Sequence, residues 1–161
     1  PGRHPDDDDQ ADKYEFVDEQ LAAAGLANYE VSNWAAPGHE SRHNFLYWRQ
    51  QNYRGFGCAA HSHVDGRRWW NIRTPDRYID AVNTGAPVEA SSETLDVDQR
   101  RSEGQQLKLR TRDGVKRSAF DQATLELVGD MLVEHPTEPD RVVLTRSGRL
   151  MANDISIRLS D

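Results

Sequence analysis

Residues 29–48 read YEVSNWAAPGHESRHNFLYW, and the final hexamer, HNFLYW, carries the densest chemistry in the chain. Its functional side chains are an imidazole, a carboxamide, a phenol and an indole, next to a guanidinium: His43, Asn44, Tyr47, Trp48 and Arg42. Imidazole can ligate iron, aromatic rings can stack, and arginine pairs with carboxylates in a fixed fork geometry. The hexamer therefore predicts a site for a flat aromatic ligand with a metal centre and acidic edges.

The residues before the hexamer have the pattern of an α/β protein. Residues 9–24 predict an amphipathic helix, with Tyr14, Val17 and Leu21 on one stripe and Gly25 just after its end. Residues 28–32 alternate as a short strand, and residues 33–41 predict a loop with a Pro37-Gly38 turn. A helix, a glycine and a strand at this spacing are typical of an α/β barrel repeat.

The residues after the hexamer predict a hairpin and a helix. Residues 55–64 begin with two glycines and continue with small residues, which let a backbone lie close to a ligand or a neighbouring strand. Asp65-Gly66 is a hairpin signal before a return strand at residues 67–72. A further helix is expected from Thr74-Pro75 to Gly85.

A domain boundary is expected near residues 85–92, which divides the chain into residues 1–88 and 89–161. The second part predicts helices at 96–110 and 121–135, a strand at 141–145 and a last helix at 148–159, which is the winged-helix plan. The helix at 121–135 carries Glu126, Asp130 and Glu134 and has no basic stripe. DNA binding is therefore disfavoured.

The composition disfavours nucleic acid as a partner and indicates the cellular compartment. The net charge is −7, and the Asp6–Asp9 run, expected as a loop into a helix N-terminus, would repel phosphate backbones. No apolar stretch reaches the ~20 residues that cross a bilayer. The single cysteine, Cys58, excludes an internal disulfide and fits a reducing cytosol, so a cytoplasmic location is expected. One thiolate also cannot hold a [4Fe–4S] cluster.

Two blocks give a specific family resemblance. YEVSNWAAPG at residues 29–38 and SRHNFLYW at residues 41–48 resemble the "YE-S-N-a-PG…s-H-N-x-x-Y-W" block of HemW-type haem chaperones. These proteins are radical SAM relatives of the oxygen-independent coproporphyrinogen III oxidases. LTRSGRLMAN at 144–153, GFGCAAH at 55–61 and WWN at 69–71 are similar to further segments of that family. The resemblance implies the C-terminal portion of such a protein.

The fold implied is α/β: the last βα units of a partial radical-SAM (β/α) barrel, then a small winged-helix-like C-terminal domain. The implied function is binding haem and delivering it to acceptor haemoproteins. His43 would ligate the haem iron, and Gly55, Gly57 and His61 would line the S-adenosylmethionine side. S-adenosylmethionine and a [4Fe–4S] cluster are implied for the longer protein, where the cluster ligands would lie. Relatives usually carry a glycine where this chain has Ala59.

Several alternatives stay open on the residues alone. His43 and Asn44 could satisfy backbone groups at a strand end, with Tyr47 and Trp48 filling core. His61 and His63 could share a metal ion on one strand face, although a structural or cofactor-lining role is favoured. The parent could instead be a coproporphyrinogen III dehydrogenase, or the chain a non-catalytic fragment. No catalytic residue is assigned, and a homodimer or a peripheral membrane contact through acceptors stays open.

Overall fold

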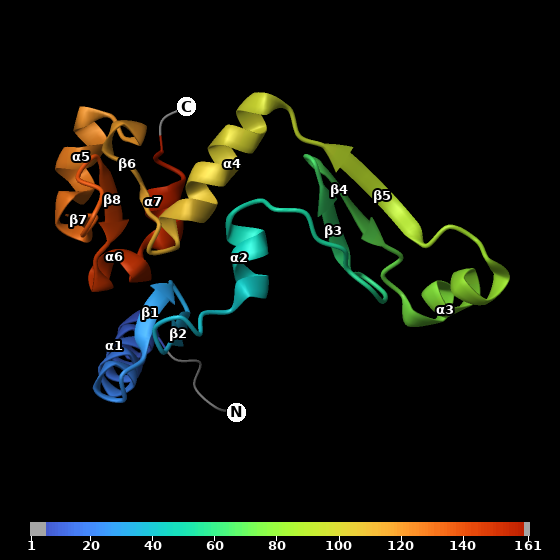
Figure 1. Ribbon diagram of the computed structural model, residues 1–161, viewed down its shortest axis with the longest axis horizontal. Helices are drawn as coiled ribbons and strands as arrows, with labels where there is room; N and C mark the ends of the chain where they lie inside the picture. The colour runs from blue at the N-terminus through green and yellow to red at the C-terminus, as the bar shows by residue number, and fades with distance from the viewer. Residues whose placement is uncertain (1–5, 160–161) are drawn as a thin grey trace. The chain divides into compact units, whose positions relative to one another are not determined.

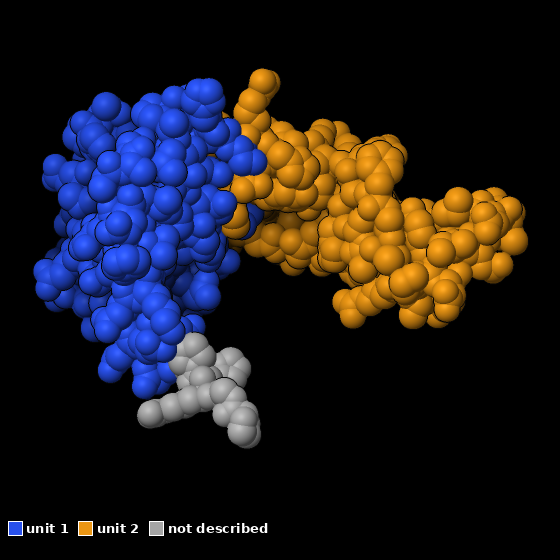
Figure 2. All heavy atoms as spheres, turned by 90° about the horizontal axis from the view of Figure 1, so that it is seen from below, with its two compact units in different colours: residues 1–41, 105–161 blue, residues 42–104 orange. Residues whose placement is uncertain are grey.

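The computed structural model describes residues 6–159; residues 1–5 and 160–161, the outer ends of the two expected domains, lie outside the description. The chain forms two compact units (Figure 2). Unit 1 groups residues 1–41 with 105–161, and unit 2 is residues 42–104, so the division falls within α4. The domain boundary expected at residues 88 and 89 stays a prediction.

The elements of the amino-terminal part of unit 1 are a helix and a hairpin (Figure 1): α1 Asp7–Ala23, β1 Ala27–Glu30 and β2 Asn33–Ala35. Asp6 caps α1, because its side chain accepts a hydrogen bond from the backbone N–H of Asp9 at 2.9 Å. The acidic run is therefore the N-cap and first turn of the helix, and the expectation that it forms a loop before the helix was wrong for Asp7–Asp9. Gly25, with φ +80°, follows the last turn.

The expectation of an unbroken loop at residues 33–41 was wrong, because its first three residues are β2. The cause is the buried side chain of Glu30, which is 1% exposed. Its Oε2 accepts hydrogen bonds from the backbone N–H of Ser32 at 3.0 Å and from Nδ2 of Asn33 at 2.6 Å. These bonds close the tight turn that pairs β1 with β2 antiparallel. Turn geometry of this kind is not visible in hydrophobic periodicity.

The carboxyl-terminal part of unit 1 holds the main hydrophobic core. Its elements are the end of α4 Val97–Leu109, β6 Val115–Lys116, η1 Arg117–Ala119, α5 Gln122–Val128, η2 Gly129–Met131, β7 Leu132–Glu134, β8 Arg141–Leu144, α6 Arg146–Leu150 and α7 Ala152–Ser156. The sheet order is β6-β8-β7, all antiparallel. The core consists of Leu109, Val115, Ala119, Phe120, Val128, Val142, Leu144, Ala152 and Ile155.

Two helix predictions here were too long. The helix expected at residues 121–135 ends at Val128, because residues 132–134 pair with β8 as β7, with Leu132 opposite Leu144. The helix expected at 148–159 is divided into α6 and α7 at Met151, whose backbone leaves the helical region. The strand expected at 141–145 is therefore the middle strand, β8, of a three-stranded sheet. For the helix expected at 121–135, strand pairing overrides local helical periodicity.

Unit 2 is a three-stranded antiparallel sheet with helices around it. Its elements are α2 Arg42–Trp48, β3 His61–Val64, β4 Arg67–Asn71, α3 Pro75–Thr84, β5 Glu89–Thr94 and the start of α4, with sheet order β3-β4-β5. The hairpin at Asp65-Gly66 and the helix from Pro75 to Gly85 are confirmed. β5 was not predicted, because its residues, EASSET, are polar and all exposed.

The mixed α/β class is confirmed, and the sheets are small and open. All strand pairs within residues 6–159 are antiparallel. The buried hydrophobic side chains of unit 2, within that same range, are Ala81 and Leu95. Large apolar side chains such as Phe56, which is 88% exposed, lie at its surface instead. Over the described residues, no helix combines the length and apolar character needed to span a bilayer.

Candidate functional site

The motif hexamer forms a short helix, α2, rather than the end of a strand. His43 and Tyr47 are four residues apart and so lie on one face of that helix. Nε2 of His43 is 2.9 Å from the Tyr47 hydroxyl oxygen, and the two rings meet edge to face with centroids 5.0 Å apart. Both side chains are exposed, Tyr47 by 38%. The imidazole is therefore held in place yet open to a ligand.

The aromatic surface continues beyond the hexamer. The ring centroids of Tyr47 and Tyr53 are 4.5 Å apart, and Tyr53 lies 6.1 Å from the ring of His63. Burial first, and then the neighbouring Tyr47, raise the pKa of Tyr53, so its phenol stays neutral at physiological pH. Tyr53 was not among the predicted site residues, because only its backbone bridge to His63 brings it to the site.

The other predicted residues of the hexamer occupy neighbouring positions. Asn44 and Trp48 are one helical turn apart and half-buried, and Arg42 is exposed at the first position of α2. The guanidinium of Arg49 stacks 4.3 Å over the ring of Phe45. The structure thus places all five predicted residues on one short helix, but it does not test their assignment to a ligand.

His61 and His63 lie on the same face of β3, as the spacing predicted, because they pair with Trp70 and Arg68 of β4. The ring of His61 stacks on Trp70 at 5.8 Å, and Nδ1 of His63 is 3.1 Å from the carbonyl oxygen of Gln51. His63 is buried, whereas His61 is exposed. Over residues 6–159, no three His, Cys, Asp or Glu side chains come together as a metal site.

The glycines at 55 and 57 shape the loop that leads into β3. A Cβ on Gly55 would overlap the carbonyl oxygen of His61, and its N–H donates to the Ser62 hydroxyl at 3.0 Å. Gly57 has φ +101° and donates its N–H to the Tyr78 hydroxyl at 3.2 Å. These contacts give both glycines a structural role, while their assignment to a cofactor stays a prediction.

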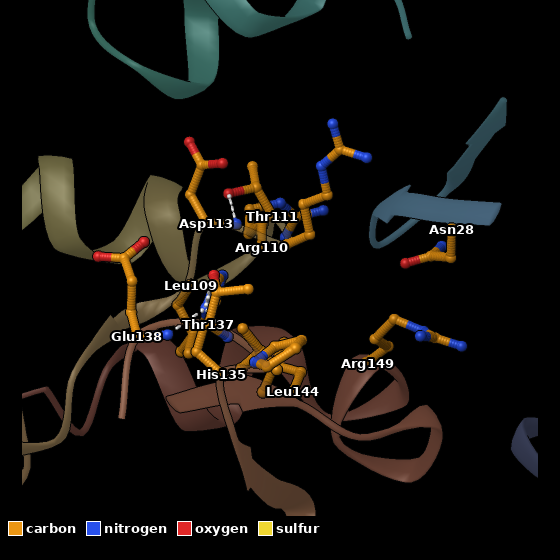
Figure 3. A pocket seen from close by; sticks show the side chains of 13 residues that line it. Asn28, Leu109, Arg110, Thr111, Asp113, His135, Thr137, Glu138, Leu144 and Arg149 are labelled. Atoms are coloured by element: carbon orange, nitrogen blue, oxygen red, sulfur yellow. Dashed lines mark hydrogen bonds between the residues drawn. The ribbon is translucent and has the colours of Figure 1, made fainter. Parts of the chain in front are cut away.

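A cavity of about 510 Å³ lies in unit 1 and includes none of the predicted site residues (Figure 3). It is lined by residues of β1, the end of α4 and the segment after it, the loop between β7 and β8, β8 itself, and α6. No local sequence pattern predicts it, because its walls come from five separate parts of the chain.

Comparisons with known proteins identify the relatives of this chain. No family model matches it. It is 39% identical over 155 residues to "Heme chaperone HemW" of Mycobacterium tuberculosis, covering 94% of this chain and 39% of that protein. It is 31% identical to the Bacillus subtilis protein of the same name, covering 94% of this chain and 42% of that one. The chain thus spans about two fifths of the length of these relatives.

A solved structure shares the fold. The Escherichia coli protein described as "Coproporphyrinogen III oxidase (HemN) … is a Radical SAM enzyme" matches with a TM-score of 0.69 and 16% identity, over 95% of this chain and 41% of that one. At this identity the match concerns the fold, which agrees with the architecture expected from the motifs. Over nearly all of its length the chain is thus similar in sequence to HemW haem chaperones, and its fold matches a C-terminal part of the coproporphyrinogen III oxidase fold.

Proposed function

We propose that this chain is the haem-binding segment of a HemW-like chaperone that delivers haem to acceptor haemoproteins. The observation that carries the proposal is the exposed His43–Tyr47 pair on α2. The names of the relatives, which are haem chaperones, support it. We also propose a cytoplasmic location, because a chain with a single cysteine fits a reducing compartment.

The chemistry of the α2 face suits haem as cargo. A neutral imidazole is a common protein ligand to haem iron, and His43 supplies one at the surface. The rings of Tyr47 and Tyr53, 4.5 Å apart, offer an aromatic edge on which a porphyrin can rest. Arg42, exposed at the start of the helix, can pair with a propionate carboxylate. Asn44 and Trp48 complete the proposed lining.

The iron–sulfur cluster of the wider superfamily does not fit the residues of this chain. Cys58 is the one cysteine among 161 residues, and a [4Fe–4S] cluster is held by several thiolates. No step of the proposed function runs through that cluster. For the longer protein, Gly55, Gly57 and His61 are proposed to lie on the S-adenosylmethionine side, where a backbone free of side chains permits close approach.

Haemin titration tests the proposal directly. The full chain is titrated with haemin and the Soret band recorded, for the wild type, for His43→Ala and for His39→Ala. His39 is also exposed but lies outside α2, so its replacement is a matched control. We expect a shifted Soret band in the wild type and in His39→Ala, and at least tenfold weaker binding in His43→Ala. Equal spectra for all three proteins would remove His43 as the ligand.

The similarity in fold to a coproporphyrinogen III oxidase supports one alternative function, namely that oxidase activity. That activity would belong to the full-length parent and would form protoporphyrinogen IX under anaerobic conditions. An anaerobic assay of the parent for this product separates the two functions. Formation of protoporphyrinogen IX would favour the coproporphyrinogen III oxidase function. Haem transfer to an apo-haemoprotein without this product would favour the chaperone function.

A further inference from the structure

The lining of the cavity in unit 1 combines apolar and polar side chains. Its apolar members are Leu109 and Leu144, which are 1% and 8% exposed, together with Val143 and Pro136. Figure 3 shows His135 and Asn28 on different sides of the open space. A volume of about 510 Å³ is within the range of small-ligand sites, which are typically apolar with a few placed polar groups.

The loop between β7 and β8 fixes the tautomer of His135. Its Nδ1 lies 3.3 Å from the backbone nitrogen of Thr137 and 3.1 Å from that of Glu138. A backbone nitrogen can only donate, so Nδ1 must accept, and the proton of the neutral imidazole sits on Nε2. Prolines at 136 and 139 restrict this loop further. His135 therefore offers the cavity a fixed N–H donor that has no partner among residues 6–159.

Asn28 offers the complementary group. Its Nδ2 donates to the carbonyl oxygens of Glu30 at 2.7 Å and Asn33 at 3.4 Å, so both amide hydrogens are used within the hairpin. The amide oxygen, Oδ1, has no hydrogen-bond partner within the described part of the chain and is turned toward the open space in Figure 3. The cavity thus has a fixed acceptor as well as a fixed donor.

The charges around the cavity are already compensated. Three arginines line it, and each faces a carboxylate: Arg110 with Glu30 at 3.4 Å, Arg112 with Glu40 at 2.7 Å and Arg149 with Asp18 at 2.9 Å. Glu138, also in the lining, likewise faces an arginine, Arg141, at 3.9 Å. A free anion therefore finds no uncompensated cation here, so the cavity favours an uncharged ligand.

From this arrangement we propose that the cavity binds an uncharged amide ligand of the peptide class. A carbonyl oxygen of the ligand accepts from Nε2–H of His135, an N–H donates to Oδ1 of Asn28, and an apolar side chain rests on Leu109 and Leu144. Peptide segments carry donor, acceptor and apolar group together at this scale. The site goes beyond haem binding and does not depend on it, because no residue of α2 takes part.

The probe is N-acetyl-L-leucine methylamide, titrated into the full chain and followed by amide NMR shifts. The ligand efficiency of so small a molecule puts its Kd at roughly 1 mM. His135→Asn is the diagnostic variant: the Asn side-chain oxygen can still accept from the backbone of Thr137 and Glu138, but the Nε2–H donor is lost. We expect about tenfold weaker binding, the equivalent of one hydrogen bond. His39→Asn, the same exchange outside the cavity, should bind like the wild type.

Three results of these titrations would overturn the proposal. They are no binding of the probe at tens of millimolar, equal binding to a folded His135→Asn variant, and tighter binding of N-acetyl-L-leucine, whose carboxylate tests the anion alternative. If His135→Asn does not fold, the proposal is tested by the wild-type protein alone, through the imidazole signals of His135. Long-range proton–nitrogen spectra should show the Nε2–H tautomer of His135, with that proton shifting on addition of the methylamide. An unmoved Nε2–H signal at saturation would also reject the site.

Discussion

Nη2 of Arg149 lies 2.9 Å from Oδ2 of Asp18, so that α6 is held to α1 across 131 positions of sequence. Arg146 donates to the same oxygen at 2.8 Å, and Nε1 of Trp34 donates to Oδ1 at 2.6 Å. Asp18 is only 7% exposed. One buried carboxylate therefore connects the first helix, the β1–β2 hairpin and the last core elements of unit 1.

Replacing this carboxylate should loosen unit 1. Asp18→Asn keeps the size of the side chain but removes the charge that faces Arg146 and Arg149. Hydrogen bonds to charged groups contribute about 1.5–3 kcal/mol, so we expect the free energy of unfolding to fall by about 2 kcal/mol. Glu89→Gln, at the exposed Arg67–Glu89 pair, is the matched control and should cost less than about 1 kcal/mol. Urea unfolding of the three proteins measures the difference.

The same carboxylate predicts an acid-dependent loss of stability. Burial alone would raise the pKa of Asp18, but hydrogen bonds from Trp34 and Arg146 and the charge of Arg149 outweigh it and lower that pKa. A depressed folded-state pKa stabilises the protein fully above the unfolded value of about 3.9, and this contribution is lost as pH falls through the folded-state pKa. Unfolding midpoints should therefore decline more below about pH 4 in the wild type than in Asp18→Asn. Parallel declines would contradict this assignment.

Ala59 adopts a backbone conformation suited to glycine. Its φ is +58°, in the left-handed region that costs a residue with a Cβ about 1 kcal/mol. Ala59→Gly should therefore stabilise unit 2 by up to about 1 kcal/mol, although glycine normally destabilises a folded chain through entropy. Ala60→Gly, one position on, has no positive φ to relieve and should destabilise. Thermal unfolding of both variants tests the sign, and a lower midpoint for Ala59→Gly would contradict the argument.

Gly55 has the opposite constraint. A Cβ at this position would overlap the backbone carbonyl of His61, which cannot move without disturbing β3. Gly55→Ala should thus destabilise unit 2 by about 1–3 kcal/mol, in the range of overpacked sites. Gly129→Ala is the control, because nothing lies within 4 Å of its added Cβ and its φ is not positive. Denaturant unfolding compares the two, and equal midpoints would show that the loop yields to the methyl group.

Helices and turns whose ends carry typical capping or turn residues were predicted from local sequence. The α1 and α3 helices have an N-cap aspartate or an N1 proline and a glycine at the end, and the Asp65-Gly66 hairpin has its turn residues. Sequence resemblance predicted the family, because the HNFLYW and YEVSNWAAPG blocks are specific. The mixed α/β class followed from both.

Elements that depend on distant partners could not be predicted. β5 is polar and exposed, and only its pairing with β4 makes it a strand. Thr111 is buried although it is polar, with its hydroxyl donating to the Lys108 carbonyl at 2.8 Å and accepting from the Asp113 N–H at 3.2 Å. Tyr53 reaches the candidate site through a single backbone bridge. Such contacts are set by tertiary structure, which periodicity does not encode.

Breaking the hydrogen bond between His43 and Tyr47 should raise haemin affinity, whereas removing the iron-binding imidazole in His43→Ala should lower it. Nε2 of His43 is 2.9 Å from the Tyr47 hydroxyl, so iron coordination through Nε2 must first break this bond. Tyr47→Phe removes the hydroxyl but keeps the ring packed 4.5 Å from Tyr53. A hydrogen bond of about 0.5–1.5 kcal/mol no longer competes, so haemin affinity should rise roughly two- to tenfold.

Tyr53→Phe is the control for this prediction, because it also removes a phenolic hydroxyl but leaves His43 and its bond to Tyr47 in place. Its haemin affinity should therefore stay within about twofold of the wild type, a change well below one hydrogen bond. Soret titrations of the wild type and both variants supply the Kd values. Weaker binding by Tyr47→Phe would mean that the hydroxyl orients the imidazole for iron, with Nδ1 as the coordinating nitrogen. Unchanged binding would mean that the His43–Tyr47 bond does not compete with haem at all.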